Sequence, residues 1–219
     1  NPQAIDDLQN ILQTSDGIMI ARGDLGVELP TESVPVLQKE LITAAIGLAK
    51  PVITATQMLE SMINRPRPTR AETSDVANAI LDGTDALMLS AETAIGRFPL
   101  EAVETMNRIA THTENRSGPY SRLVEERFYS QDRSITTTYG VCQAALLAAN
   151  QLKTDKIIVF TASGSTANII SSFRPSQTIF AFTHNKPVFP RLNLLRGVFP
   201  VLINEIANTD TLIQIADQI

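Results

Sequence analysis

Three short polar segments carry the side chains that could do chemistry, and each comes at the end of an apolar run. The first, residues 22–26, directly follows the apolar residues 17–21. An aspartate such as Asp24 at the end of a strand can reach a hard cation such as Mg²⁺, which takes oxygen ligands and keeps positions open for substrate oxygens. Gly23 would let a ligand approach the backbone, and the turn from Leu25 onward would present N–H groups to an anion. The competing interpretation is a plain turn, because short turns with Gly and Asp are common in α/β loops.

The second segment ends the apolar run 51–56 with two threonines. A hydroxyl at the carboxyl end of a strand can hydrogen-bond a substrate carboxylate or donate to an enol oxygen. Alternation along a strand puts Thr54 and Thr56 on one face, so both are candidates, and Thr56 is the better one because it is nearer the strand end. Strand threonines, however, mostly satisfy β propensity alone.

The third segment, residues 90–93, follows the apolar run 86–90 and offers a further hydroxyl and carboxylate. Groups behind a binding site often hold its ligands in place. Four residues are candidates for this supporting role: Arg22, Gln57, Ser90 and Glu92. An ordinary turn at a strand end would explain the third segment equally well.

Residues 65–70 hold three arginines stiffened by two prolines. Thr69 is a candidate N-cap, and Glu72 three residues later would complete a capping box. The segment is either a loop over an anion or a subunit contact, or it is a solvated charged loop before a capped helix.

A further candidate segment, residues 161–167, is rich in hydroxyls and lies between a predicted strand and a predicted helix. Hydroxyls and exposed helix N-terminal amides together form a phosphate cradle. The segment has no lysine at the spacing of a nucleotide-triphosphate loop, which argues against triphosphate hydrolysis. Alternatively, Ser163 or Ser165 only caps the helix. His112 and His184 have no neighbouring ligand pattern, so no zinc site is predicted.

The elements that must position these side chains alternate along the first half of the chain. Strands are predicted at 17–21, 51–56 and 86–90, and helices at 31–49, 73–81 and 100–114. Apolar strands separated by helices indicate a parallel sheet that is covered on both faces. Three strands alone would leave an apolar edge open, so we expect part of a larger barrel or sheet. The polar segments would then lie at the carboxyl ends of the strands, where the active sites of TIM barrels are found.

A second α/β region follows a change of composition at 115–132, where glycine, proline and several charges interrupt the pattern. We expect domains at 1–115 and 134–219, joined by a junction at 116–133. The second region is predicted to be a small doubly wound sheet with a helix at 134–152, strands at 156–160, 178–182 and 198–202, and an amphipathic helix at 210–219. Pro200 either weakens the last strand assignment or places that strand at an edge.

Composition limits the possible partners. The chain of 219 residues has a formal net charge of -5 and no block of basic residues, which argues against nucleic-acid binding. No apolar run approaches the length of a membrane span, and the start lacks a signal pattern, so we expect no membrane partner. The single cysteine, Cys142, is predicted to be a buried thiol in a reducing compartment, which favours the cytoplasm. The lack of an initiator Met and the apolar last residue suggest a piece of a longer protein.

The polar segments and their order resemble pyruvate kinase. The resemblance rests on residues 19–28, 54–62, 65–72, 74–79, 82–85 and 88–93, and it extends more loosely through the second region. It implies that the last three βα units of a TIM (β/α)₈ barrel lead into part of the family's α/β C-terminal allosteric domain. It also implies phosphoryl transfer from phosphoenolpyruvate to ADP, which gives pyruvate and ATP in glycolysis, with Mg²⁺ or Mn²⁺ and K⁺ as cofactors and a homotetramer as the assembly.

Residue by residue, the resemblance implies that Gly23, Asp24 and Thr56 bind substrate and that Asp24 binds the metal. Thr161, Ser163, Gly164 and Thr166 fall where many members bind the phosphate of a sugar-phosphate effector, and a nucleotide effector is also possible. The sequence departs from one common version in having Ala162 and Ser165 where basic residues often stand, so activation by fructose 1,6-bisphosphate is not predicted.

The family's Lys-Ile-Glu segment, which supplies the catalytic lysine and a second metal carboxylate, would lie before Asn1. No catalytic residue is therefore predicted on this chain, and the 219 residues alone are expected to be inactive. Two other functions stay open at this point: an isolated effector-binding or assembly module, and a metal-dependent aldolase or lyase of the pyruvate-enolate type.

Overall fold

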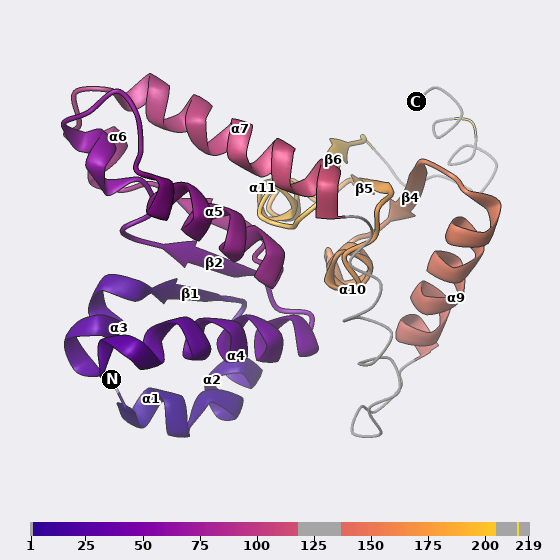
Figure 1. Cartoon of the computed structure of the whole chain (residues 1–219). Coiled ribbons are helices and arrows are strands. Elements are labelled where there is room, and N and C mark those ends of the chain that lie inside the picture. Colours follow the sequence, from indigo (N-terminus) through magenta and orange to yellow (C-terminus); the bar gives the residue numbers. More distant parts are fainter. Residues whose placement is uncertain (1, 118–136, 205–213, 215–219) are drawn as a thin grey trace. The chain divides into compact units, whose positions relative to one another are not determined.

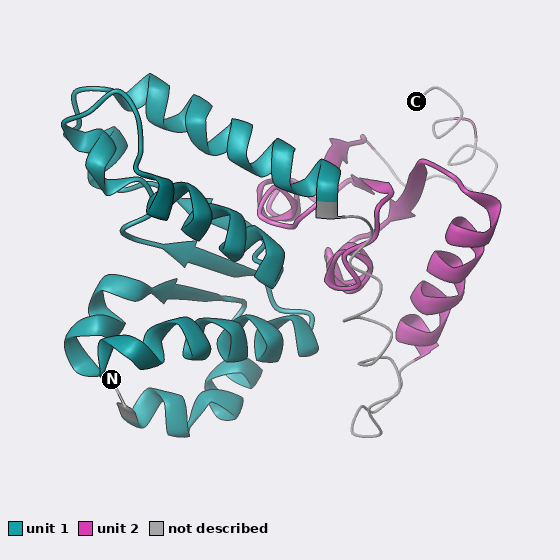
Figure 2. Ribbon diagram, in the orientation of Figure 1, with its two compact units in different colours: residues 1–118 teal, residues 119–219 magenta. Residues whose placement is uncertain are grey.

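A computed structural model describes residues 2–117, 137–204 and 214. The chain divides into two compact units, 1–118 and 119–219 (Figure 2). The predicted junction from 118 onward and the predicted helix at 210–219, apart from Gln214, lie outside the described residues. In the described part of the chain, no helix is long and apolar enough to cross a membrane.

Unit 1 contains a parallel sheet in the order β1-β2-β3, which confirms the three predicted strands. Its strands are β1 (Ile18–Ala21), β2 (Val52–Ala55) and β3 (Ala86–Met88). The register pairs Ala21 with Ala55 and Ala55 with Met88, so the three carboxyl ends meet at one edge of the sheet. The three polar segments therefore begin at the same edge.

Helices connect these strands, as the alternating pattern predicts (Figure 1). The helical elements of unit 1 are α1 (Pro2–Asp6), α2 (Leu8–Thr14), α3 (Arg22–Glu28), η1 (Thr31–Ser33), α4 (Val34–Gly47), η2 (Glu60–Ile63), α5 (Arg70–Asp82), α6 (Ala91–Ala94) and α7 (Pro99–Ser117). The helix expected at 31–49 begins with a 3₁₀ turn, and Pro35 lies in the first turn of α4, where its missing N–H costs no helical bond.

The interpretation of residues 22–26 as a plain turn is wrong, because this segment forms helix α3. Gly23 and Gly26 lower the intrinsic helix propensity of the segment, so the sequence pattern does not predict a helix there. Asp24 lies in the first turn, where a negative charge is favourable next to the positive end of the helix dipole.

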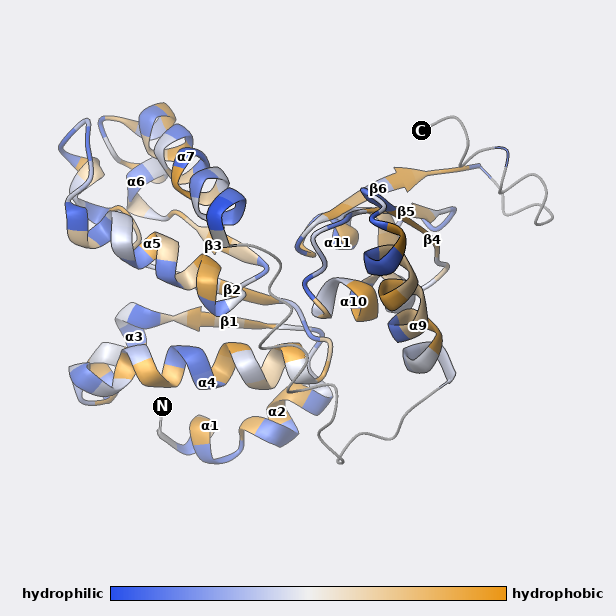
Figure 3. Ribbon diagram, turned by 45° about the vertical axis from the view of Figure 1, so that its right-hand side comes forward, coloured by the Kyte–Doolittle hydropathy of each residue, from blue (hydrophilic) through white to orange (hydrophobic). Residues whose placement is uncertain are grey.

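Two hydrophobic clusters support unit 1. One joins α2, β1, α4 and β2, and the other joins the segment after β2 to α5 and α7, which pack side by side (Figure 1). The strands of unit 1 are mostly apolar, with Thr54 on β2 as the polar exception (Figure 3). Met19 on β1 is nevertheless 54% exposed. An exposed apolar side chain on a parallel sheet fits a sheet that forms only part of a larger barrel.

Unit 2 contains a second parallel sheet in the order β4-β5-β6, and its strands lie where the three strands were predicted. Its described elements are α9 (Thr137–Leu152), β4 (Lys156–Phe160), α10 (Ser165–Ser172), β5 (Thr178–Thr183), α11 (Val188–Leu192) and β6 (Val198–Leu202). Pro200 on β6 pairs with Ala181 on β5. Because β6 is an edge strand of the described sheet, it tolerates the missing N–H of Pro200. Cys142 is 2% exposed within the core, which confirms the predicted buried thiol.

Candidate functional site at the strand ends of unit 1

The candidate site centres on a contact between the segments that follow β1 and β2. The backbone N–H of Gly23, in the first turn of α3, donates to Oγ1 of Thr56 at 2.9 Å. Asp24 is the next residue of the same turn, and its side chain is exposed. The structure thus brings Gly23, Asp24 and Thr56 together at the carboxyl edge of the sheet.

The backbone turns sharply at Thr56. Strand β2 ends at Ala55, and the next two residues have positive φ angles, +67° at Thr56 and +54° at Gln57. A left-handed conformation is unusual for a β-branched residue, and strain of this kind collects at functional sites. The exposed side chain of Gln57 follows directly.

The prediction that Thr54 and Thr56 share a face is wrong, because Thr56 lies beyond the strand and alternation no longer applies. Thr54 is fully buried and donates to Oγ1 of Thr84 at 3.1 Å. Oγ1 of Thr84 in turn lies 3.0 Å from the carbonyl oxygens of Val52 and Ala86. Thr54 therefore belongs to a network that joins the strands, and Thr56 alone reaches the edge.

Arg22 holds this turn in place. Its side chain is 9% exposed, and Nη2 donates to the carbonyl oxygens of Thr56 at 2.8 Å and Gln57 at 3.2 Å. Nη1 pairs with the carboxylate of Asp75 on α5 at 2.6 Å. The supporting role predicted for Arg22 is consistent with these contacts.

Sequence reasoning passed over Asp75 as a site residue. It lies 53 positions from Arg22, so no local spacing connects the two residues. The one available signal is helical: Glu72 and Asp75 are three residues apart, which places both carboxylates on one side of α5.

Glu92, on α6 after the third strand, supports the segment that follows this turn. Its side chain is 2% exposed, and its two oxygens accept the backbone N–H groups of Leu59 at 3.1 Å and Ser90 at 2.8 Å. The hydroxyl oxygen of Ser90 is buried and has no hydrogen-bond partner within the described residues. Glu92 thus ties the ends of β2 and β3 together.

The predicted capping box at the start of α5 is confirmed. Thr69 Oγ1 accepts the N–H of Glu72 at 3.2 Å, and Glu72 accepts the N–H of Thr69 at 2.7 Å. Glu72 also accepts from the N–H and the hydroxyl of Ser61 at 2.7 and 2.6 Å. Burial acts to raise the pKa of Glu72, but the hydrogen bonds from Ser61 and Thr69 together lower it below its ordinary value. The three arginines of the preceding loop are exposed: Arg65, Arg67 and Arg70.

The fit of Asp24 to a divalent cation can be judged from the donor set. In the described part of the chain, no group of three or more His, Cys, Asp or Glu side chains comes together. Mg²⁺ is commonly held by one or two carboxylates together with waters and substrate phosphates. The exposed carboxylate of Asp24 therefore fits as one ligand of such a cation, with the others supplied from elsewhere.

Unit 2 contains the predicted phosphate segment. Thr161 is 4% exposed, and its Oγ1 accepts the N–H of Gly164 at 2.9 Å. The N-cap residue of α10 is Gly164, with φ +87° and no side-chain capping bond, so neither Ser163 nor Ser165 is the N-cap. Ser163 Oγ accepts the N–H of Ser165 at 3.3 Å. The hydroxyls and the start of α10 do lie together, as the sequence predicts.

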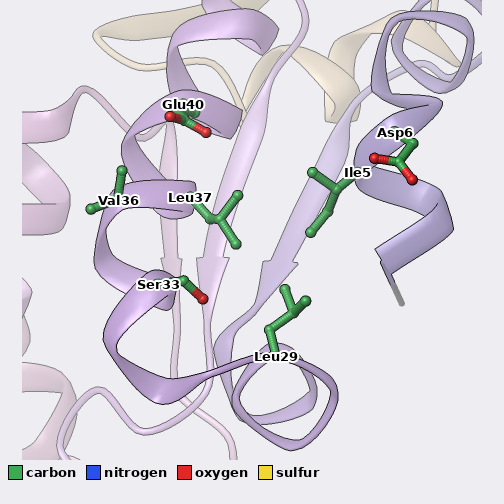
Figure 4. A pocket seen from close by; sticks show the side chains of 7 residues that line it. All are labelled: Ile5, Asp6, Leu29, Ser33, Val36, Leu37 and Glu40. Carbon is green, nitrogen blue, oxygen red and sulfur yellow. The ribbon is translucent and has the colours of Figure 1, made fainter.

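A separate groove in unit 1 was not anticipated from the sequence. It lies between α1 and the segment from the end of α3 to α4 (Figure 4). Its lining is Ile5, Asp6, Leu29, Ser33, Val36, Leu37 and Glu40. It includes none of the residues at the carboxyl edge.

Comparisons with known proteins give consistent matches for both units. The family model described as pyruvate kinase, barrel domain, matches residues 1–103, and the model described as pyruvate kinase, alpha/beta domain, matches residues 140–219.

Relatives match along the whole chain. A pyruvate kinase of Bacillus licheniformis is 48% identical over 218 residues, which is 100% of this chain and 37% of that protein. Pyruvate kinase 2 of Synechocystis is 50% identical over 216 residues, covering 98% of this chain and 35% of that protein. A crystal structure of a pyruvate kinase from Cryptosporidium parvum superposes with a TM-score of 0.94 at 42% identity, covering 99% of this chain and 43% of that one. The chain thus spans little more than a third of the length of the curated relatives.

Proposed function

Because this chain belongs to the pyruvate kinase family, we propose that it forms part of the substrate site of a longer protein that transfers the phosphoryl group of phosphoenolpyruvate to ADP. The products would be pyruvate and ATP, in glycolysis. The observation that carries the proposal is the 2.9 Å hydrogen bond from Gly23 to Thr56, because it places the segments after β1 and β2 against each other beside Asp24.

Thr56 is suited to act as a donor. Its Oγ1 already accepts the N–H of Gly23, so its own hydroxyl proton is available for a ligand. Loss of the phosphoryl group leaves negative charge on the enolate oxygen of the substrate. A fixed hydroxyl aimed at that oxygen stabilises the charge without reorganising during the reaction.

Asp24 is the proposed ligand for Mg²⁺ or Mn²⁺. A divalent cation bound there would offset negative charge on the substrate oxygens. The carboxylate of Asp24 is exposed at the start of α3, so it can reach a ligand above the sheet edge. A Cβ at Gly23 would lie 3.4 Å from Oγ1 of Thr56, so the missing side chain lets Thr56 lie close to the backbone beside Asp24.

We expect the 219 residues alone to be inactive. Asp24 offers one carboxylate, whereas the resemblance places the family's lysine and second metal carboxylate before Asn1. Activity would therefore require the longer protein, for which the family implies K⁺, a homotetramer and a cytoplasmic location. The match to both pyruvate kinase models favours this function over a metal-dependent aldolase and over an isolated effector module.

A coupled assay of ATP formation from phosphoenolpyruvate and ADP tests the proposal. The longer protein should turn over, the 219-residue chain should not, and Asp24→Asn in the longer protein should lower kcat by at least about 100-fold. Asp16→Asn is the matched control, because Asp16 is an exposed aspartate of the same unit outside the site. A longer protein that forms no ATP from phosphoenolpyruvate would contradict the proposal.

The segment 161–166 of unit 2 is the proposed site for the phosphate of a sugar-phosphate or nucleotide effector. Its support is the juxtaposition of Thr161, Ser163, Gly164 and Thr166 at the start of α10. Calorimetry of the longer protein with sugar phosphates and with AMP tests this, with a Thr161→Ala, Ser163→Ala double variant as the comparison. Equal heats of binding for both proteins would contradict the assignment.

A further inference from the structure

An ion pair connects helix α5 to the turn that carries Thr56. The carboxylate oxygens of Asp75 accept hydrogen bonds from Nη1 of Arg22 at 2.7 and 2.6 Å. The side chain of Arg22 is 9% exposed and that of Asp75 is 38% exposed. The arginine therefore lies inside unit 1, and Asp75 is the carboxylate that neutralises it.

The remaining donors of the guanidinium are directed at one short stretch of backbone. Nε and Nη2 of Arg22 donate to the carbonyl oxygen of Thr56 at 3.3 and 2.8 Å. Nη2 also lies 3.2 Å from the carbonyl oxygen of Gln57 and 2.9 Å from Sδ of Met58. Because the planar guanidinium carries several N–H donors in a fixed arrangement, Nη1 can bind Asp75 while Nε and Nη2 bind the turn.

This turn needs an external restraint. Thr56 and Gln57 are two successive residues with positive φ, and the conformation is costly for a β-branched side chain. Such residues persist only where the surroundings over-determine them. Without the bonds from Arg22, the turn could relax toward extended backbone, and that would rotate the Thr56 hydroxyl away from Gly23.

We propose that Asp75 is a positioning residue for the reaction: it orients the Arg22 guanidinium, which fixes the left-handed turn and so the Thr56 hydroxyl. This inference rests on the proposed function, in which Thr56 donates to the substrate. Asp75 contacts Arg22 and acts only through it. Removing the carboxylate leaves a buried guanidinium without its charge partner, and such a group shifts toward water or another acceptor.

Asp75→Asn in the longer protein is the direct test, because asparagine keeps the size of the side chain and removes its charge. We expect kcat for ATP formation to fall by about 10- to 100-fold, since small displacements of a reacting group cost rates of that order. The matched control is Asp82→Asn on the same helix. Asp82 is 8% exposed and accepts from Gln38 at 2.9 Å and from Lys39, neither of which belongs to the Thr56 turn. After correction for the folded fraction, its kcat should stay within about twofold of the parent.

Arg22→Lys provides an independent variant if Asp75→Asn fails to fold. Lysine can pair with Asp75 but lacks the fork that also reaches the Thr56 carbonyl, so kcat should fall to a similar degree. When Asp75→Asn is added to Arg22→Lys, kcat should fall by less than about threefold below that of Arg22→Lys alone, because both changes act on one network.

The outcomes separate the two proposals. A parent protein without phosphoenolpyruvate-dependent ATP formation overturns the proposed function itself. If the parent is active, two results would overturn the positioning role alone. In the first, kcat of Asp75→Asn equals that of Asp82→Asn. In the second, the effects of Asp75→Asn and Arg22→Lys on kcat multiply independently in the double variant. A fall in kcat for Asp75→Asn and Arg22→Lys, spared in Asp82→Asn, supports it.

Discussion

Glu92 Oε1 accepts the backbone N–H of Leu59 at 3.1 Å, so a carboxylate after the third strand restrains the segment after the second. Glu72 restrains the same segment at Ser61, and Asp75 does so through Arg22. Three carboxylates from two βα units therefore hold residues 56–61. The candidate site is shaped by side chains that lie behind it.

Glu92→Gln should destabilise the protein by about 1–3 kcal/mol, because the glutamine amide would direct a donor at one of the two N–H groups that Glu92 now accepts. Urea unfolding gives the free energy. The control is Glu101→Gln on α7, whose exposed side chain should change stability by no more than about 0.5 kcal/mol. Equal losses for the two variants would count against the bonds to Leu59 and Ser90.

The strands could be predicted from the sequence because each is a short apolar run followed by polar residues, a pattern that is typical of buried strands in a parallel sheet. Helix α3 could not, since Gly23 and Gly26 weaken the helical signal. The left-handed backbone conformation of Thr56 could not be predicted either, because a β-branched residue after a strand favours continuation of the strand. The Arg22–Asp75 pair joins residues 53 positions apart, which come together in a fold that packs α5 against the segment after β2.

Acid should loosen the start of α5 through Glu72. Its pKa is lowered in the folded protein by the bonds from Ser61 and Thr69, which outweigh the opposing effect of burial. A lowered folded-state pKa gives stability that is present above the ordinary glutamate pKa and is lost as the pH falls toward the folded value. Glu72 is only partly buried, so solvent screens its charge and we expect a small effect.

The measurement is the difference in Tm between the parent and Glu72→Gln, followed from neutral pH downward. The parent should be more stable at neutral pH, and the difference should shrink as Glu72 becomes protonated. The exposed Glu101→Gln again serves as the control. A difference that stays constant through the acid range would show that the carboxylate charge of Glu72 adds nothing.

Cys142 should react slowly with thiol reagents in the folded protein. It is 2% exposed in the core of unit 2, and burial raises the pKa of its thiol, so little thiolate is available. It is the single cysteine of the chain, so labelling reports on this site alone. Alkylation at pH 8 should be at least about 100-fold slower than in denaturant. Rapid labelling of the native protein would mean that α9 opens readily.

The strongest contrast in the molecule is between two threonines two positions apart. Thr54 is fully buried and its hydroxyl bonds to Thr84, whereas the Thr56 hydroxyl accepts from Gly23 at the sheet edge. Thr54→Val should cost about 1 kcal/mol of stability and leave kcat of the folded longer protein within about twofold, because valine fills the same space inside the sheet.

Thr56→Val should cost a similar amount, since the N–H of Gly23 loses its acceptor, but it should also lower kcat by about 100-fold because the donor to the enolate oxygen is gone. Thr56→Ser restores the hydroxyl and should recover most of that rate. If Thr54→Val and Thr56→Val lower kcat equally, the position of Thr56 beyond the strand is not what gives it a role in the reaction.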